Sequence, residues 1–123
     1  MTHSQLRGLA IGGTLAMALL VGGCQAPRTA AEAMVDARAT FLTAEGAFTL
    51  YAMQPFCDAP AAPKPPLCAD RAAVRQGAAA AREVATTLDA ADVIVAAKGQ
   101  PDLGAISTLV AKFVALVAKA RGG

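Results

Sequence analysis

The side chains best suited to chemistry in this sequence belong to three cysteines, because the chain has one histidine and no tryptophan. Cys57 and Cys68 enclose a proline-rich stretch of the chain. Redox-active and metal-binding pairs usually have the closer Cys-x-x-Cys spacing, and zinc sites usually add histidine. In an oxidising compartment, two cysteines at this wider spacing are expected to form a structural disulfide. We therefore predict a Cys57–Cys68 bridge, which would stabilise the domain by about 3 kcal/mol.

The third cysteine, Cys24, follows a segment that is typical of a secretory signal peptide. One cation, Arg7, precedes an uncharged apolar run over residues 9–21. A helix that spans a bilayer needs about 20 residues, and this run is shorter. We therefore predict a cleaved signal peptide over residues 1–23 rather than a permanent transmembrane helix.

The residues before Cys24, Val21-Gly-Gly23, give the segment a resemblance to the bacterial lipobox. The resemblance implies a diacylglycerol thioether on Cys24, cleavage before it and N-acylation of the new amino group. Three lipid chains would anchor the protein firmly, since each buried CH₂ contributes about 0.8 kcal/mol. In lipoproteins of Gram-negative bacteria an Asp after the cysteine tends to retain the protein in the inner membrane. Because Gln25 stands there, the resemblance implies the outer membrane, with the domain facing the periplasm. An ordinary signal peptide with a coincidental cysteine is the alternative.

Little else in the sequence is suited to catalysis. Cleavage before Cys24 would remove His3, and the remaining chain would hold one serine, Ser107, and no asparagine. Nucleophilic catalysis by Ser or Cys needs a base, usually histidine, and the sequence has no Gly-rich phosphate-binding motif. The net charge of +2 is small for a domain that binds nucleic acid. We therefore expect no enzyme activity, no catalytic residue, no metal site, no cofactor and no nucleic-acid partner.

The rest of the chain is expected to form helices, because alanine, its commonest residue, favours helix over strand. A capping box at Thr29-Ala-Ala-Glu32 predicts the first helix start. Pro55 predicts its end near Met53 or Gln54, since proline disfavours helix in the residue before it. Apolar residues recur between these limits at steps of three and four, as one face of an amphipathic helix requires: Met34, Ala37, Phe41, Ala44, Phe48 and Tyr51 or Ala52.

Two further helices are predicted by the same signals. Asp70 is the expected N-cap of the second, and Lys98-Gly99 is expected to end it with a left-handed cap. The third helix follows Gln100-Pro-Asp102. The expected core face of the second helix comprises Val74, Ala78, Ala81, Ala85, Leu88, Ala91 and Val95. That of the third comprises Leu103, Ile106, Leu109 or Val110, Phe113, Leu116 or Val117, and Ala120.

These elements predict an all-α domain over residues 29–123, joined to the lipidated Cys24 by a tether over residues 24–28. Short and medium connections make consecutive helices antiparallel, so we expect a small antiparallel three-helix bundle. The Pro-rich, disulfide-closed loop would lie between helices one and two.

Two groups of cations could bind an anionic partner. Arg71, Arg75 and Arg82 lie within about 40° of one another on a helix and could form a basic strip. Lys112 and Lys119 lie opposite a broad apolar face, a pattern also found in helices that lie on membranes. We favour the simpler interpretation for both groups, a solvated helix flank for the arginines and core packing for the apolar face of the third helix.

The layout as a whole resembles small lipoproteins of bacterial genomes and their prophages. The specific parts of the resemblance are the lipobox, Tyr51 with Pro55-Phe-Cys57, and Leu67-Cys-Ala-Asp70. The resemblance supplies no activity. We expect a non-catalytic, lipid-anchored outer-membrane protein that serves as a structural or interaction module for a periplasmic protein partner.

Two alternatives remain open. The first is a prophage lysis or host-interaction lipoprotein, similar to the outer-membrane subunit of two-component spanins. The second is a helical bundle that binds a small apolar ligand, which would require an exposed groove lined by Phe41, Phe48 and Phe113.

Overall fold

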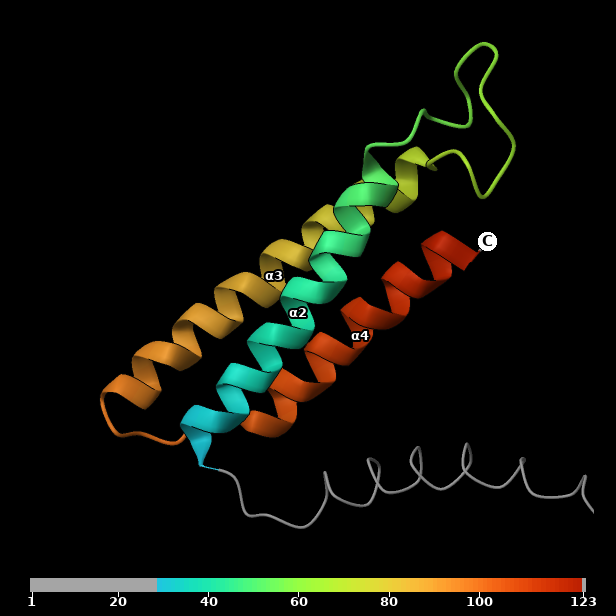
Figure 1. Cartoon of the computed structure of the whole chain (residues 1–123). Helices are drawn as coiled ribbons and strands as arrows, with labels where there is room; N and C mark the ends of the chain where they lie inside the picture. The colour runs from blue at the N-terminus through green and yellow to red at the C-terminus, as the bar shows by residue number, and fades with distance from the viewer. Residues whose placement is uncertain (1–28, 123) are drawn as a thin grey trace, which may run out of the picture.

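The computed structural model describes residues 29–122, so the predicted signal peptide (1–23), Cys24 and the tether (24–28) lie outside the described residues. The described fold contains α2 (Ala30–Ala52), α3 (Arg71–Ala96) and α4 (Leu103–Gly122). Each helix packs against the other two. α2 and α4 run in the same direction, and α3 runs antiparallel to both (Figure 1). The predicted all-α three-helix bundle is confirmed.

The start of α2 is fixed by the predicted capping box. The Thr29 hydroxyl accepts a hydrogen bond from the Glu32 N–H at 3.2 Å, and the Glu32 carboxylate accepts one from the Thr29 N–H at 3.1 Å. These bonds satisfy two N–H groups that lack partners at a helix start. The helix ends at Ala52 with Met53 as its C-cap, so the predicted stop before Pro55 is confirmed.

The core is centred on Phe113 of α4. Its ring packs against two rings of α2, with centroid distances of 5.5 Å to Phe41 and 6.1 Å to Phe48. Such tilted aromatic pairs stabilise a core beyond the area that they bury. The buried residues of α2 are Met34, Phe41, Ala44, Phe48 and Tyr51, and those of α4 are Ile106, Val110, Phe113 and Val117. Both sets lie on the predicted faces.

The core face of α3 differs from the predicted one. Gly77 and Val84 are buried. Four residues that the sequence pattern places in the core are half-buried and pack against its edge: Val74, Ala78, Ala85 and Val95. The burial of Gly77 follows from the close approach of Phe48, because a Cβ on residue 77 would lie 2.2 Å from Cε2 of that ring. Glycine therefore lets the ring pack directly on the α3 backbone. The remaining buried positions of α3 agree with the prediction: Ala81, Leu88 and Ala91.

The turn from α3 to α4 corrects the predicted cap. The residue with left-handed geometry is Lys98, with φ of 59°, and not Gly99. Lys98 N–H donates to Val95 O at 2.9 Å, and Gly99 N–H donates to Ile94 O at 2.8 Å. These two bonds form a Schellman motif, in which the residue after the C-cap is usually glycine. Asp102 caps the start of α4, because its carboxylate accepts a hydrogen bond from the Ala105 N–H at 2.9 Å.

Candidate functional site

The connector between α2 and α3 is closed at its base. The predicted Cys57–Cys68 disulfide is present, with the two Cα atoms 5.0 Å apart. Beside it, Ala69 N–H donates to Pro55 O at 2.9 Å, and Cys57 N–H donates to Ala69 O at 3.0 Å. We call this unit, residues 51–57 and 68–70, the clasp. Its two cysteines are consumed in a structural bond.

Tyr51 joins the clasp to the start of α3. Its buried hydroxyl oxygen accepts a hydrogen bond from the Asp70 N–H at 2.8 Å. The Asp70 carboxylate in turn accepts one from the Ala73 N–H at 2.8 Å, which confirms Asp70 as the N-cap. The clasp therefore contains all but Leu67 of the residues that carry the sequence resemblance between positions 51 and 70.

Arg71 belongs to the clasp end of the bundle rather than to a free basic strip. Its guanidinium donates to Asp58 at 2.9 Å and lies 3.9 Å from the centroid of the Phe56 ring. Such a cation–π contact favours a fixed position for the guanidinium. Arg75 and Arg82 are exposed on α3. Because the first of the three arginines is held by Asp58 and Phe56, the solvated-flank interpretation is the better one for this group.

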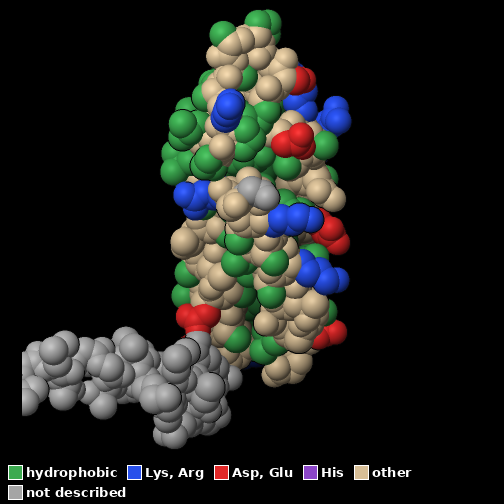
Figure 2. Space-filling view, turned by 90° about the vertical axis from the view of Figure 1, so that its right-hand side faces the viewer, with side chains coloured by type: hydrophobic (Ala, Val, Ile, Leu, Met, Phe, Trp, Pro, Cys, Tyr) green, Lys and Arg blue, Asp and Glu red, His purple; other side chains and the backbone are tan. Residues whose placement is uncertain are grey.

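The end of the bundle that carries the clasp also exposes apolar side chains. Leu50, Met53 and Leu67 are all more than half exposed. Figure 2 shows hydrophobic side chains gathered towards this end of the molecule. These three residues are scattered over a helix end and a loop, and we assign them no site.

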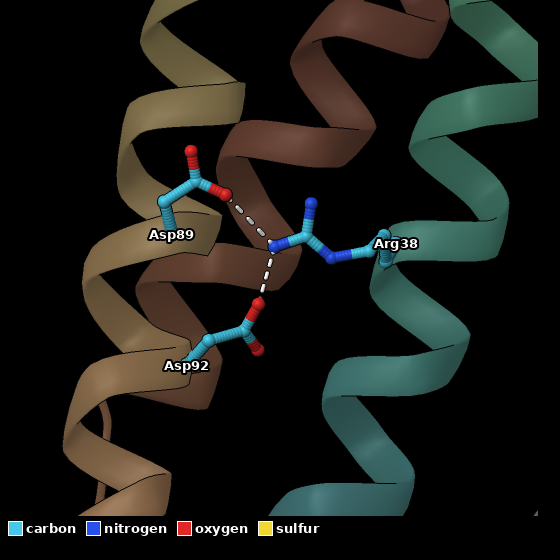
Figure 3. Close-up of polar contacts among 3 residues, drawn as sticks. All are labelled: Arg38, Asp89 and Asp92. Carbon is cyan, nitrogen blue, oxygen red and sulfur yellow. Dashed lines mark hydrogen bonds and ion pairs between the residues drawn. The ribbon is translucent and has the colours of Figure 1, made fainter.

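A cluster of charged side chains joins α2 to α3. The Arg38 guanidinium donates to Asp89 at 3.1 Å and also to Asp92 (Figure 3). The hydrogen bonds to Asp92 and then Asp89 raise the pKa of Arg38 above its ordinary value. All three side chains are partly exposed, so their contribution to stability is small. The cluster aligns α2 with α3, and a sequence pattern alone does not reveal its long-range pairing.

The phenylalanines do not line an exposed groove. Phe41, Phe48 and Phe113 are 3%, 7% and 1% exposed, and they fill the interior. The exposed groove that the apolar-ligand alternative requires at these residues is therefore not formed, and the closed core counts against that alternative.

A groove of a different kind lies between α2 and α4. Two adjacent hollows, of about 500 and 620 Å³, are both lined by Thr40 and Val114 and so form one recess. We call this recess the α2–α4 groove. Small side chains form most of its walls: Ala39, Thr43 and Ala47 on α2, and Ala111, Ala115 and Ala118 on α4.

The composition of α4 explains why this surface is apolar. Among the described residues, α4 is the helix that is long and apolar enough to cross a membrane, by length and composition alone. Four of its side chains are used in the core instead, Ile106, Val110, Phe113 and Val117. The alanines beside them remain exposed and form the wall of the groove.

Within residues 29–122, no group of three or more His, Cys, Asp or Glu side chains is placed to hold a metal ion. Comparisons of the chain with protein-family models, with curated proteins and with solved structures found no match. The arrangement described here offers a closed core, a cross-linked connector and an open apolar groove. Of these three, the groove is the feature suited to binding.

Proposed function

We propose that this protein is a non-catalytic interaction module of the bacterial envelope, held on the outer membrane by lipid on Cys24 and facing the periplasm. The sequence from Arg7 to Gln25 supports the anchor and the location. The α2–α4 groove supports the interaction. This groove is the observation that carries the proposal, because the closed interior leaves no room for a ligand and the groove is the open apolar surface.

The dimensions of the groove fit a helix of a protein partner. α4 has 20 residues, which corresponds to a length of about 30 Å at about 1.5 Å per residue. A helix of similar length can lie along a groove with small residues on its walls, because small side chains let two backbones approach closely. Recognition of this kind places the apolar face of a partner helix in a hydrophobic groove.

The anchor is tested by labelling cells with a palmitate analogue. The full-length protein should be labelled and should fractionate with the outer membrane, whereas a Cys24→Ala variant should be unlabelled. A Cys24→Ala variant that keeps the label would contradict the lipoprotein assignment. A Cys57→Ser and Cys68→Ser variant is the matched control, because it removes the other cysteines and should keep the label.

The groove is tested by placing a photo-cross-linking residue at position 114 of the full chain in intact cells. Val114 lines both hollows, whereas Thr86, the control position, is exposed on α3. We expect protein adducts from position 114 and none from position 86. Equal adducts from both positions, or none from position 114, would overturn the interaction proposal.

A further inference from the structure

We propose that the partner in the α2–α4 groove is a second copy of this chain, bound antiparallel to the first. This inference deepens the proposed function and rests on the same groove. Three properties of the groove support it: its internal hydrogen bonds, its two charges and its area.

The two threonine hydroxyls of the groove are hydrogen-bonded within the protein. The Thr40 hydroxyl donates to Asp36 O at 3.0 Å, and the Thr43 hydroxyl donates to Ala39 O at 2.9 Å. Burying a hydroxyl costs free energy mainly when its hydrogen bond is lost. Because both bonds lie within α2, these threonines can be covered by an apolar surface at small cost.

The charges of the groove lie at its two ends. Among the residues that line the two hollows, the charged ones are Asp36 and Arg121. Asp36 lies near the start of α2, in the hollow that also includes Leu103 at the start of α4. Arg121 lies near the end of α4, in the hollow that also includes Ala47. Because α2 and α4 run in the same direction (Figure 1), the two charges lie at opposite ends of one apolar face.

This charge pattern matches an inverted copy of itself. In an antiparallel pair related by a two-fold axis near Thr40 and Val114, Asp36 of each copy faces Arg121 of the other. A parallel pair would instead bring like charges together, which is unfavourable. Two-fold symmetry also requires that one surface bind itself, and a single groove with opposite charges at its ends meets that requirement.

The size of the face agrees with a reversible dimer. Two helices about 10 Å wide and about 30 Å long present roughly 600 Å². Two such faces bury roughly 1,200 Å², the lower end of the range for specific interfaces.

In this antiparallel pair the two Thr29 residues, each next to a lipid anchor, lie at opposite ends of the dimer. Both anchors could therefore reach one membrane only if the helices lie along its surface.

The test uses full-length chains with two different tags, co-expressed and purified together from detergent-solubilised membranes. Wild-type copies should co-purify. Asp36→Arg alone should weaken the association of that variant with itself by at least about tenfold, because the introduced guanidinium would face Arg121 at both ends of the pair. Arg121→Asp alone should do the same through two facing carboxylates.

Co-expression of the two variants gives the decisive result. A chain with Asp36→Arg and a chain with Arg121→Asp should co-purify like wild type, because opposite charges face each other at both ends of the mixed pair. The end that joins the two substituted positions carries a guanidinium against a carboxylate, and so does the end that joins the two unchanged ones. This rescue also shows that both variants fold. Glu83→Arg on α3 and Lys119→Asp on α4 are the matched controls, since they make the same charge changes outside the groove, and each should self-associate like wild type.

Two outcomes would overturn the inference: wild-type copies that do not co-purify, or single variants that associate as well as the controls. Failure of the proposed function is separate, because it is read from the adducts at position 114. Adducts of twice the chain mass support the second copy. Adducts of another mass would keep the interaction module but contradict self-association.

Discussion

The two ends of the bundle reverse the chain by different means. At one end, residues 53–70 join α2 to α3 through the clasp, with a disulfide, backbone hydrogen bonds and the buried Tyr51. At the other end, residues 97–102 join α3 to α4 with a Schellman motif and an Asp102 cap. The long connection is held by bonds between distant residues, and the short one by bonds between near neighbours.

The two ends contribute to stability in different ways. A disulfide acts mainly on the unfolded chain, because it reduces the entropy that folding must overcome. Caps act on the folded helices, because they satisfy N–H and C=O groups at the helix ends. The clasp should therefore respond to redox conditions, whereas the turn should respond only to changes in local geometry.

The largest effect is expected from the disulfide. Reduction, or the double change Cys57→Ser and Cys68→Ser, should lower the stability of a chain that begins at Gln25 by about 2–3 kcal/mol. For a domain of this size, that loss lowers the unfolding midpoint by roughly 10–20 °C. Circular dichroism at low temperature should be unchanged, since the helices depend on their core faces. An unchanged midpoint, or two free thiols in protein taken from the periplasm, would contradict the structural role.

Removal of the Tyr51 hydroxyl tests the noncovalent part of the clasp. Tyr51→Phe keeps the ring in place but leaves the Asp70 N–H without its acceptor, so we expect a loss of about 1–2 kcal/mol. Urea unfolding measures the loss, and amide hydrogen exchange should be faster at Asp70 and unchanged at Gly99. Equal stability of the variant and the wild type would show that this hydrogen bond contributes little to the clasp.

At the opposite end, Asp102→Ala should cost about 1 kcal/mol, because the Ala105 N–H loses its capping acceptor. Asp102→Asn retains a side-chain oxygen and should keep most of the stability. The sites are distant and share no partner, so the loss should be the same in oxidised and reduced protein. A loss that depends on the redox state would mean that the two ends are coupled.

The smallest effect is a gain. Lys98→Gly should raise stability by about 0.5–1 kcal/mol, because Lys98 holds a left-handed conformation that glycine adopts without strain. Lys98→Ala removes the same charge but keeps a Cβ, and it should bring no gain. If both variants have the same midpoint in thermal unfolding, the strain assigned to Lys98 is absent.

Much of the fold was predictable because its signals are local. The capping box at Thr29, the N-cap at Asp70 and the end of α2 before Pro55 each depend on residues a few positions apart. The disulfide was predictable by elimination, since Cys57 and Cys68 have no histidine nearby and lie too far apart for a redox motif. The core faces of α2 and α4 follow from apolar periodicity.

The remaining features depend on contacts between distant residues. Gly77 does not count as apolar in a periodic pattern, and its burial is decided by the ring of Phe48. Arg38 could pair with any carboxylate until the packing of α2 on α3 brings Asp89 and Asp92 within reach. The α2–α4 groove is likewise a product of two helices, and neither helix alone reveals it.

The closed base of the connector has a consequence for evolution. The bonds that join the two arms of the connector involve Pro55, Cys57, Cys68 and Ala69, all at the base of the loop. The hydrogen bonds inside the ring, such as that from Ala62 N–H to Ala59 O, join near neighbours in the sequence. The segment inside the ring, residues 58–67, can change in length at little cost, since closing a loop of twice the length costs only about 0.6 kcal/mol more. Insertions and foreign peptides grafted into this ring should leave the helices intact. The ring is therefore where this chain can diversify fastest while its scaffold stays constant.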